Sequence, residues 1–162
     1  MPESCVAADP LWLHQAVVRP EWVDYNGHMS EAYYVLIFGD ATDAFYDFVG
    51  MDDAFRRREK ISVYTLEAHI RYLIEAREGQ ALRIATRVLS HDTKRLRLHH
   101  TMLDQDGQIL AVTEISALHV DTTGPRGCAF RAAPLARVTE IASAQAGASA
   151  FEPAMTRHWG AA

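Results

Sequence analysis

The spacing of hydrophobic and polar positions predicts one long helix in the first third of the chain. The first half of residues 31–49, AYYVLIF, is apolar on all sides, whereas the second half keeps its large apolar side chains on one side. Ser30 is placed as an N-cap, and Gly50 lies where a helix C-cap is expected. The pattern therefore predicts a helix of about 20 residues that protein surrounds on every side.

After the polar segment 51–60 the hydrophobic period changes to two, which is typical of strands. In residues 64–74, one predicted face holds Tyr64, Leu66, Ala68, Ile70, Tyr72 and Ile74. The other face holds Thr65, Glu67, His69, Arg71 and Leu73. Three more strands are expected near 82–88, 96–102 and 108–121, separated by turns at 78–79, 91–92 and 104–107. Short turns between successive strands predict a sheet that is antiparallel over most of its width.

The two ends of the chain are predicted to flank one domain. Residues 14–24 contain a β-branched stretch that Pro20 interrupts, which indicates an edge strand because proline cannot donate to a β-ladder. We expect the domain at 14–125, after an N-terminal extension, 1–13.

The C-terminal extension, 126–162, is expected to be partly disordered, with a short helix at 135–142 and poor order from 143 onward. A strand, a helix and four strands together predict an α+β fold, in which an antiparallel sheet curves around a central helix.

Composition and charge exclude several classes of protein. Hydrophobic residues make up 49% and charged residues 23% of the chain, as in an ordinary globular domain. The formal net charge of −5 argues against duplex DNA or an anionic membrane as the main partner. The longest apolar run, 32–38, is far shorter than the roughly 20 residues that a membrane span needs.

Cysteine and histidine positions predict neither a metal nor a cofactor. Cys5 and Cys128 lack the spacing of a metal site or a disulfide framework, which favours a reducing compartment. The histidines are dispersed except for His99 and His100, which point to opposite faces of a strand. The first ten residues lack the pattern of a signal peptide, so we expect a cytoplasmic location. The chain has no GxGxxG loop and no GxSxG elbow.

The segment 22–34, WVDYNGHMSEAYY, joins the first predicted strand to the helix. Asp24 lies three residues before Gly27. This pattern resembles the acyl-CoA thioesterases of the 4-hydroxybenzoyl-CoA thioesterase type, which have the hotdog fold, and the order of predicted elements resembles that fold too. The longer stretch PEWVDYNGHMSEAYYVLIFGDATDAFY is similar to the betainyl-CoA thioesterases of carnitine degradation. The resemblance implies hydrolysis of a small acyl-CoA thioester to a free acid and coenzyme A, with betainyl-CoA as the narrower candidate.

The residue types in this segment suit thioester hydrolysis. The Asp24 carboxylate could attack the carbonyl carbon or activate water, and Gly27 would allow a close approach of substrate. Backbone N–H groups at the helix start, at Ser30 and Glu31, could stabilise the oxyanion. His28 is a candidate for orienting substrate or acting as an acid. The structural alternative is an Asx-turn, in which Asp24 only stabilises the loop.

Two further groups of residues are candidates for binding substrate. A trimethylammonium group prefers aromatic faces and carboxylates. The candidates around the predicted site are Trp22, Tyr25, Asn26, Tyr33, Tyr34, Tyr64, Glu31 and Glu67. Coenzyme A carries phosphates, which an acidic protein must hold with a local cluster of cations. The candidates here are Lys94, Arg95, Arg97, Arg87 and Arg126.

Two other functions remain open from the sequence. In hotdog hydratases an Asp and a His lie five residues apart with an Asn between them, whereas Asp24 and His28 are four apart. A non-catalytic acyl-CoA-binding module would keep the pocket without needing Asp24. The resemblance also implies a site between two subunits, so we expect a homodimer or a dimer of dimers.

Overall fold

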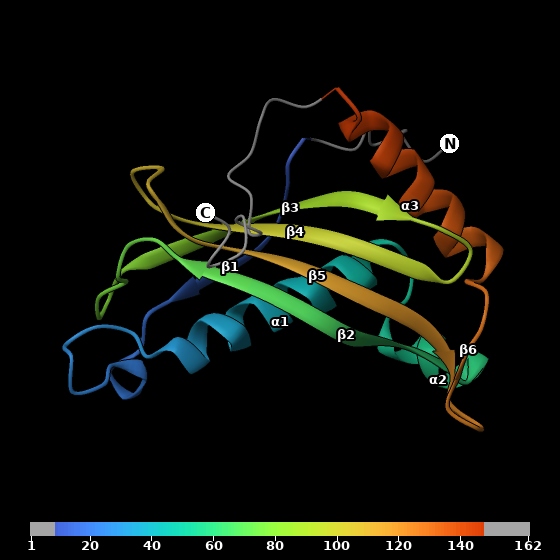
Figure 1. The fold of residues 1–162 in the computed structure, drawn as a ribbon, viewed down its shortest axis with the longest axis horizontal. Helices are drawn as coiled ribbons and strands as arrows, with labels where there is room; N and C mark the ends of the chain where they lie inside the picture. Colours follow the sequence, from blue (N-terminus) through green and yellow to red (C-terminus); the bar gives the residue numbers. More distant parts are fainter. Residues whose placement is uncertain (1–8, 148–162) are drawn as a thin grey trace, which may run out of the picture.

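An antiparallel sheet curves around one long helix in the computed structural model, which describes residues 9–147 (Figure 1). The strands are β1 (Leu11–Val17), β2 (Ile61–Tyr72), β3 (Ala81–His91), β4 (Arg95–Asp104), β5 (Ile109–Asp121) and the short β6 (Arg126–Gly127). The helices are the 3-10 turn η1 (Pro20–Trp22), α1 (Glu31–Phe48), α2 (Asp53–Glu59) and α3 (Ala132–Gln145). This arrangement confirms the predicted α+β hotdog fold.

The sheet has the order β1-β3-β4-β5-β2, so β1 and β2 form its two edges. Every pairing is antiparallel, as predicted. The expectation of a strand over 14–24 is wrong in its bounds, because β1 ends at Val17 and Pro20 begins η1. Proline has the fixed φ that suits the first residue of a helical turn, and it lacks the N–H that a strand would use.

The central helix α1 follows Ser30 and ends just before Gly50, which has a φ of 87°. Ser30 has the extended backbone of an N-cap, although its side chain makes no capping hydrogen bond. One face of α1 packs into the core with Tyr34, Ile37, Phe38, Ala41, Phe45 and Tyr46. The opposite face exposes Val35 to 52% and Leu36 to 47%. A single chain therefore does not surround the helix on every side, so the predicted burial requires a second chain.

A β-bulge between Thr65 and Glu67 changes the facing of side chains along β2. Ala68 lies opposite Ile115, and Thr65 lies opposite Ala117, so both belong to the face toward α1. Tyr64 lies opposite Leu118, on the outer face with Glu67. The predicted common face for Tyr64 and Ala68 is therefore wrong, because one extra residue shifts the alternation.

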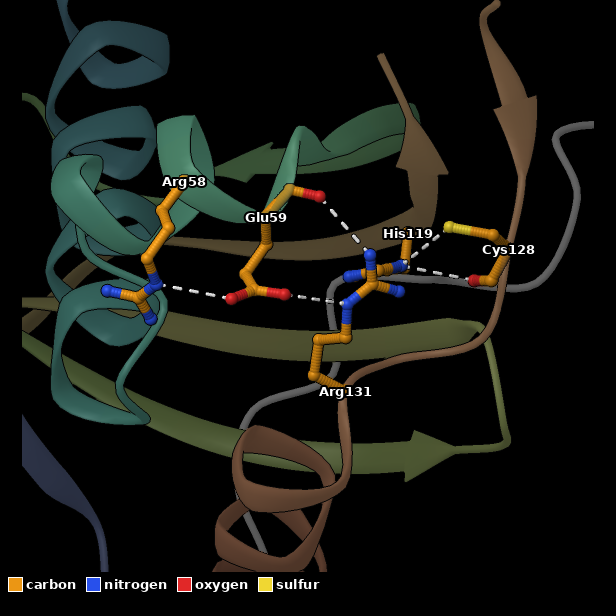
Figure 2. A network of polar contacts seen from close by, with 5 residues as sticks. All are labelled: Arg58, Glu59, His119, Cys128 and Arg131. Carbon is orange, nitrogen blue, oxygen red and sulfur yellow. Dashed lines mark hydrogen bonds and ion pairs between the residues drawn. The ribbon is translucent and has the colours of Figure 1, made fainter. Parts of the chain in front are cut away.

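The segment after β6 packs onto the sheet and onto α2 (Figure 2). The Arg131 guanidinium contacts the Glu59 carboxylate at 3.3 Å and donates to the Glu59 carbonyl oxygen at 3.2 Å. The His119 Nδ1 lies 3.1 Å from the Cys128 carbonyl oxygen and 3.3 Å from its Sγ. Hydrogen bonds from Arg58 and Arg131 lower the pKa of Glu59. These contacts hold the start of α3 in place.

The helix α3 is longer than the predicted 135–142. It packs beside β3, where β1 no longer covers the edge of that strand (Figure 1). Part of the segment predicted to be poorly ordered thus belongs to the fold, and 148–162 lie outside the described residues, as does Cys5. No helix among residues 9–147 has the length and hydropathy that a membrane crossing requires.

Candidate active site

A tight loop before α1 presents Asp24. An isolated β-bridge between Val23 and Met29 closes the loop, and the Asp24 N–H donates to the His28 carbonyl oxygen at 3.2 Å. The Gly27 N–H donates to the Asp24 carbonyl oxygen at 3.0 Å, and Gly27 has a φ of 81°, which a residue with a Cβ rarely adopts. The short connection fixes Asp24 next to the start of the helix.

The Asp24 carboxylate has one oxygen in the loop structure and one oxygen available. Its Oδ1 accepts a hydrogen bond from the Asn26 N–H at 2.8 Å, so the Asx-turn considered as an alternative is present. Oδ2 forms no hydrogen bond or ion pair with residues 9–147, and the side chain is half-buried. The Asx-turn orients the carboxylate without occupying both oxygens, so it is compatible with a chemical role for Asp24.

The opposite wall of the site comes from the segment just after β2. The Ala76 carbonyl oxygen accepts from the Met29 N–H at 2.7 Å, and the Ala76 N–H donates to the Tyr34 hydroxyl oxygen at 2.9 Å. Tyr72 meets the Tyr34 ring edge-on, with centroids 5.2 Å apart. These contacts hold residues 73–76 against the N-terminal end of α1.

A cavity of about 580 Å³ lies between these two walls. That volume is within the range of small-molecule sites. Its lining comprises Asp24, Tyr25, Asn26, His28, Met29, Ser30, Glu31, Tyr34, Tyr72, Leu73, Ile74 and Glu75. The predicted catalytic and substrate-binding residues that share this cavity are Asp24, Tyr25, Asn26, His28, Ser30, Glu31 and Tyr34. Gly27 and Tyr33 are not among the lining residues. Among residues 9–147, three carboxylates line the cavity, and neither lysine nor arginine does.

The backbone around the helix start corrects one predicted role. The Ser30 N–H donates to the Trp22 carbonyl oxygen at 2.9 Å, so it cannot also bind an oxyanion. The Glu31 N–H, first in α1, has no partner within the described part of the chain. Glu31 therefore fits the oxyanion role predicted for both residues, and the helix dipole would favour negative charge there.

Other predicted substrate contacts lie outside the cavity lining. Trp22 stacks on Tyr33 with ring centroids 5.4 Å apart, so these two rings contact each other. Tyr64 and Glu67 lie on the outer face of β2, on either side of the bulge. Tyr25 lines the cavity but is 97% exposed, which places it at the rim.

Of the predicted coenzyme A cations, Lys94, Arg95 and Arg126 lie at the far end of the sheet from the cavity, and Arg87 lies nearer the middle. Tyr72 is opposite Ala111 on β5, whereas Arg95 is opposite Leu118. Seven residues of strand separate these positions, which is roughly 23 Å at about 3.3 Å per residue. Lys94 lies in the turn just before Arg95.

These cations also have acidic neighbours. Arg95 pairs with Asp92 at 2.7 Å, Arg97 with Glu114 at 3.0 Å, Arg87 with Asp9 at 2.7 Å and Arg126 with Asp121 at 3.9 Å. Within one chain they do not join the Asp24 site, and their role in binding coenzyme A stays a prediction.

The sequence patterns missed five lining residues, of which Tyr72 and Glu75 carry polar groups and Met29, Leu73 and Ile74 are apolar. Burial, with the nearby Glu31 charge, raises the pKa of Tyr72, and burial raises the pKa of Tyr34, beside Glu75. A bond from its own backbone N–H, together with Arg77 and His28, lowers the pKa of Glu75. Alternation alone placed Tyr72 on a strand face and gave no signal that the strand ends beside the Asp24 loop.

Comparison with known proteins identifies the family. A family model described as the thioesterase-like superfamily matches residues 18–148. The chain belongs to this superfamily. It is 44% identical over 135 residues to the betainyl-CoA thioesterase of Pseudomonas aeruginosa, an alignment that covers 83% of this chain and 85% of that protein. The chain is accordingly a thioester hydrolase with the hotdog fold, as the motif around Asp24 predicted.

A longer relative and two solved structures agree with this assignment. The L-carnitine dehydrogenase/betainyl-CoA thioesterase of Agrobacterium fabrum is 49% identical over 77% of this chain, which spans 26% of that protein. A putative thioesterase from Pseudomonas putida KT2440 has a TM-score of 0.80 at 33% identity, with 94% and 97% of the two chains covered. A Staphylococcus aureus protein solved in complex with CoA has a TM-score of 0.80 at 25% identity, over 91% and 99%.

Proposed function

We propose that the chain hydrolyses betainyl-CoA to betaine and coenzyme A, with Asp24 as the reactive carboxylate. The observation that carries this proposal is the unoccupied Asp24 Oδ2 in a cavity that also contains the start of α1. The named activities of the relatives from Pseudomonas aeruginosa and Agrobacterium fabrum support betainyl-CoA as the substrate.

The reaction can be followed atom by atom. In the general-base route, Asp24 accepts a proton from water while the water oxygen bonds to the thioester carbonyl carbon. The Glu31 N–H would donate to the oxyanion of the tetrahedral intermediate. The carbon–sulfur bond then breaks, the coenzyme A sulfur takes up a proton, and the free acid leaves. In the nucleophilic route, Asp24 Oδ2 attacks the carbonyl carbon, and the carbon–sulfur bond breaks with loss of the coenzyme A thiolate, which takes up a proton. Water then hydrolyses the resulting mixed anhydride, which releases the free acid and restores the Asp24 carboxylate.

An Asp24→Asn substitution tests this proposal. It keeps size and hydrogen bonding but removes the charge, so thiol release from betainyl-CoA should fall at least about 100-fold, the low end for losing a general base. The matched control is Asp121→Asn, because Asp121 also accepts a backbone N–H two residues ahead, from Thr123 at 2.8 Å, but lies outside the cavity. Near wild-type turnover in Asp24→Asn would refute the role of Asp24.

We also propose a homodimer as the minimal active form. Residues 64–69 of β2 are exposed on both faces of that edge strand, and the neighbouring face of α1 exposes Val35 and Leu36. Between them lies a groove of about 440 Å³. It is lined partly by Tyr46 and Thr113, whose hydroxyls are buried with no partner in the described residues. An uncovered strand edge beside an apolar helix face favours pairing with a second copy.

Two further expectations from the sequence, a dimer of dimers and a cytoplasmic location, stay predictions. Hydrolysis without a cofactor also stays a prediction; within 9–147 no three His, Cys, Asp or Glu side chains gather in a way that could hold a metal.

A further inference from the structure

The cavity has a chemical character that hydrolysis alone does not require. Beside Asp24, it contains the carboxylates of Glu31 and Glu75 and the rings of Tyr34 and Tyr72. Removal of a proton from water needs only one carboxylate. The other two carboxylates would repel an anionic group, and no lysine or arginine among the lining residues offsets them.

The two tyrosine rings are held in fixed positions. The Tyr34 hydroxyl oxygen accepts from the Ala76 N–H at 2.9 Å, and this ring is 3% exposed. Tyr72 packs edge-on against it at 85°, with nearly half of its own surface exposed. A preorganised aromatic surface loses little conformational freedom when a ligand binds, so its contact energy contributes fully to selectivity.

The charges lie close enough to these rings to act with them. Glu75 follows Tyr72 by three residues, and its negative charge acts on the Tyr34 hydroxyl. Glu31 acts in the same way on Tyr72. Arg77, whose side chain is 77% exposed and does not line the cavity, pairs with the Glu75 carboxylate at 3.7 Å. The wall formed by residues 72–75 thus combines an aromatic ring with a carboxylate.

This combination matches a quaternary ammonium. A trimethylammonium group is permanently cationic and has no hydrogen to donate, so it is recognised by ring faces and negative potential rather than by hydrogen-bond acceptors. In a betainyl thioester one methylene joins the ammonium to the carbonyl carbon. Because the ammonium is so near the carbonyl carbon, a carboxylate and an aromatic ring in the same cavity as Asp24 can contact the ammonium.

We propose that Tyr72 and Glu75 select a cationic acyl group, with Tyr34 and Glu31 completing its surroundings. The inference rests on the proposed function and adds the residues that determine its specificity. It replaces the earlier candidates Tyr64 and Glu67, which lie on the outer face of β2.

The test compares kcat/KM for betainyl-CoA with that for its neutral carbon isostere, 3,3-dimethylbutanoyl-CoA. The wild type should prefer the cationic substrate roughly 5- to 30-fold. Glu75→Gln should reduce kcat/KM for betainyl-CoA by about 3- to 10-fold and leave the neutral substrate within about twofold. Tyr72→Leu should have the same selective effect, whereas Tyr72→Phe, which keeps the ring, should retain the preference.

Glu78→Gln is the matched control, because it removes a charge nearby on a side chain that does not line the cavity. If the wild type prefers betainyl-CoA but Glu75→Gln and Tyr72→Leu keep that preference, the specificity inference is wrong and the proposed function stands. If the wild type hydrolyses the neutral isostere equally well or better, both the substrate assignment and this inference fail, even if Asp24→Asn is inactive.

Discussion

His100 shows how single residues connect the helix to the sheet. The Thr42 hydroxyl donates to the Phe38 carbonyl oxygen at 2.8 Å, so its oxygen accepts from the His100 Nε2–H at 3.0 Å. The His100 Nδ1 must then accept from the Thr86 hydroxyl, 2.9 Å away. A neutral imidazole thereby joins α1 to β3 and β4, in the interior of the protein.

Acid should destabilise the protein through this histidine. Burial, with smaller contributions from His99 and His14, lowers the pKa of His100 from 6.5 to about 3. Between these values the unfolded chain binds a proton that the folded chain does not, so stability falls as the pH falls from 6.5 toward 3. From pH 6.5 to 5 we expect a loss of about 1–2 kcal/mol from this residue.

Urea unfolding of wild type and His100→Asn at both pH values measures this contribution. The variant should lose about 1–2 kcal/mol less than the wild type over the same interval. His91→Asn, at a surface histidine that contacts the Thr139 hydroxyl, is the control and should keep the wild-type difference. An unchanged pH dependence in His100→Asn would contradict the assignment.

At the residue scale, the sequence predicted the site residues that are close together in the chain better than those that only the fold brings together. Asp24, His28 and Glu31 lie within eight residues of one another, so their spacing alone brings them together. Tyr72 and Glu75 join them only because β2 ends beside the loop. The choice of Tyr64 over Tyr72 could not be corrected from alternation, since both occupied one predicted face.

At the scale of elements, hydrophobic periodicity located α1 and the long strands, and it failed where local geometry breaks the period. The bulge after Thr65 leaves no clear mark in the sequence, yet it changes which face Tyr64 occupies. The extent of α3 was also missed. Its packing depends on the free edge of β3, which is a property of the assembled sheet.

Gln145 of α3 substitutes for a missing strand at that edge. β1 begins to pair with β3 at Leu11, opposite Thr86, so the edge beyond has no strand partner there. The Gln145 Oε1 accepts from the Val88 N–H at 2.9 Å, and its Nε2 lies 3.5 Å from the Thr86 carbonyl oxygen. A side-chain amide offers the same donor and acceptor as a peptide group.

Gln145→Leu should therefore destabilise the fold by about 1–3 kcal/mol, because it leaves the buried Val88 N–H without an acceptor. Urea unfolding measures the loss, and faster hydrogen exchange at Val88 should accompany it. The control Thr139→Ala removes an exposed contact to His91, 2.9 Å long, from the same helix and should cost less than about 0.5 kcal/mol. Equal stability of Gln145→Leu and wild type would show that the amide does not serve as a strand substitute.

At the scale of the whole molecule, the two edges of the sheet differ. On the β1 side, β1 does not reach the C-terminal end of β3, and α3 packs there instead. The β2 edge has exposed side chains on both faces and lies next to the exposed side of α1. The expected burial of that helix on every side is fulfilled only if a second chain supplies the missing cover.

Leu36→Glu tests this arrangement. Leu36 is 47% exposed in the single chain, so a charge there should leave the monomer folded but should disfavour an apolar interface. Light scattering at micromolar concentration should show a dimer for the wild type and a shift toward monomer for the variant, with thioesterase activity falling in parallel. The matched control is Val17→Glu, at an apolar side chain 56% exposed on the β1 edge, which should remain dimeric and active. A wild-type monomer with full activity would overturn the dimer, because the Asp24 cavity would then be complete within one chain.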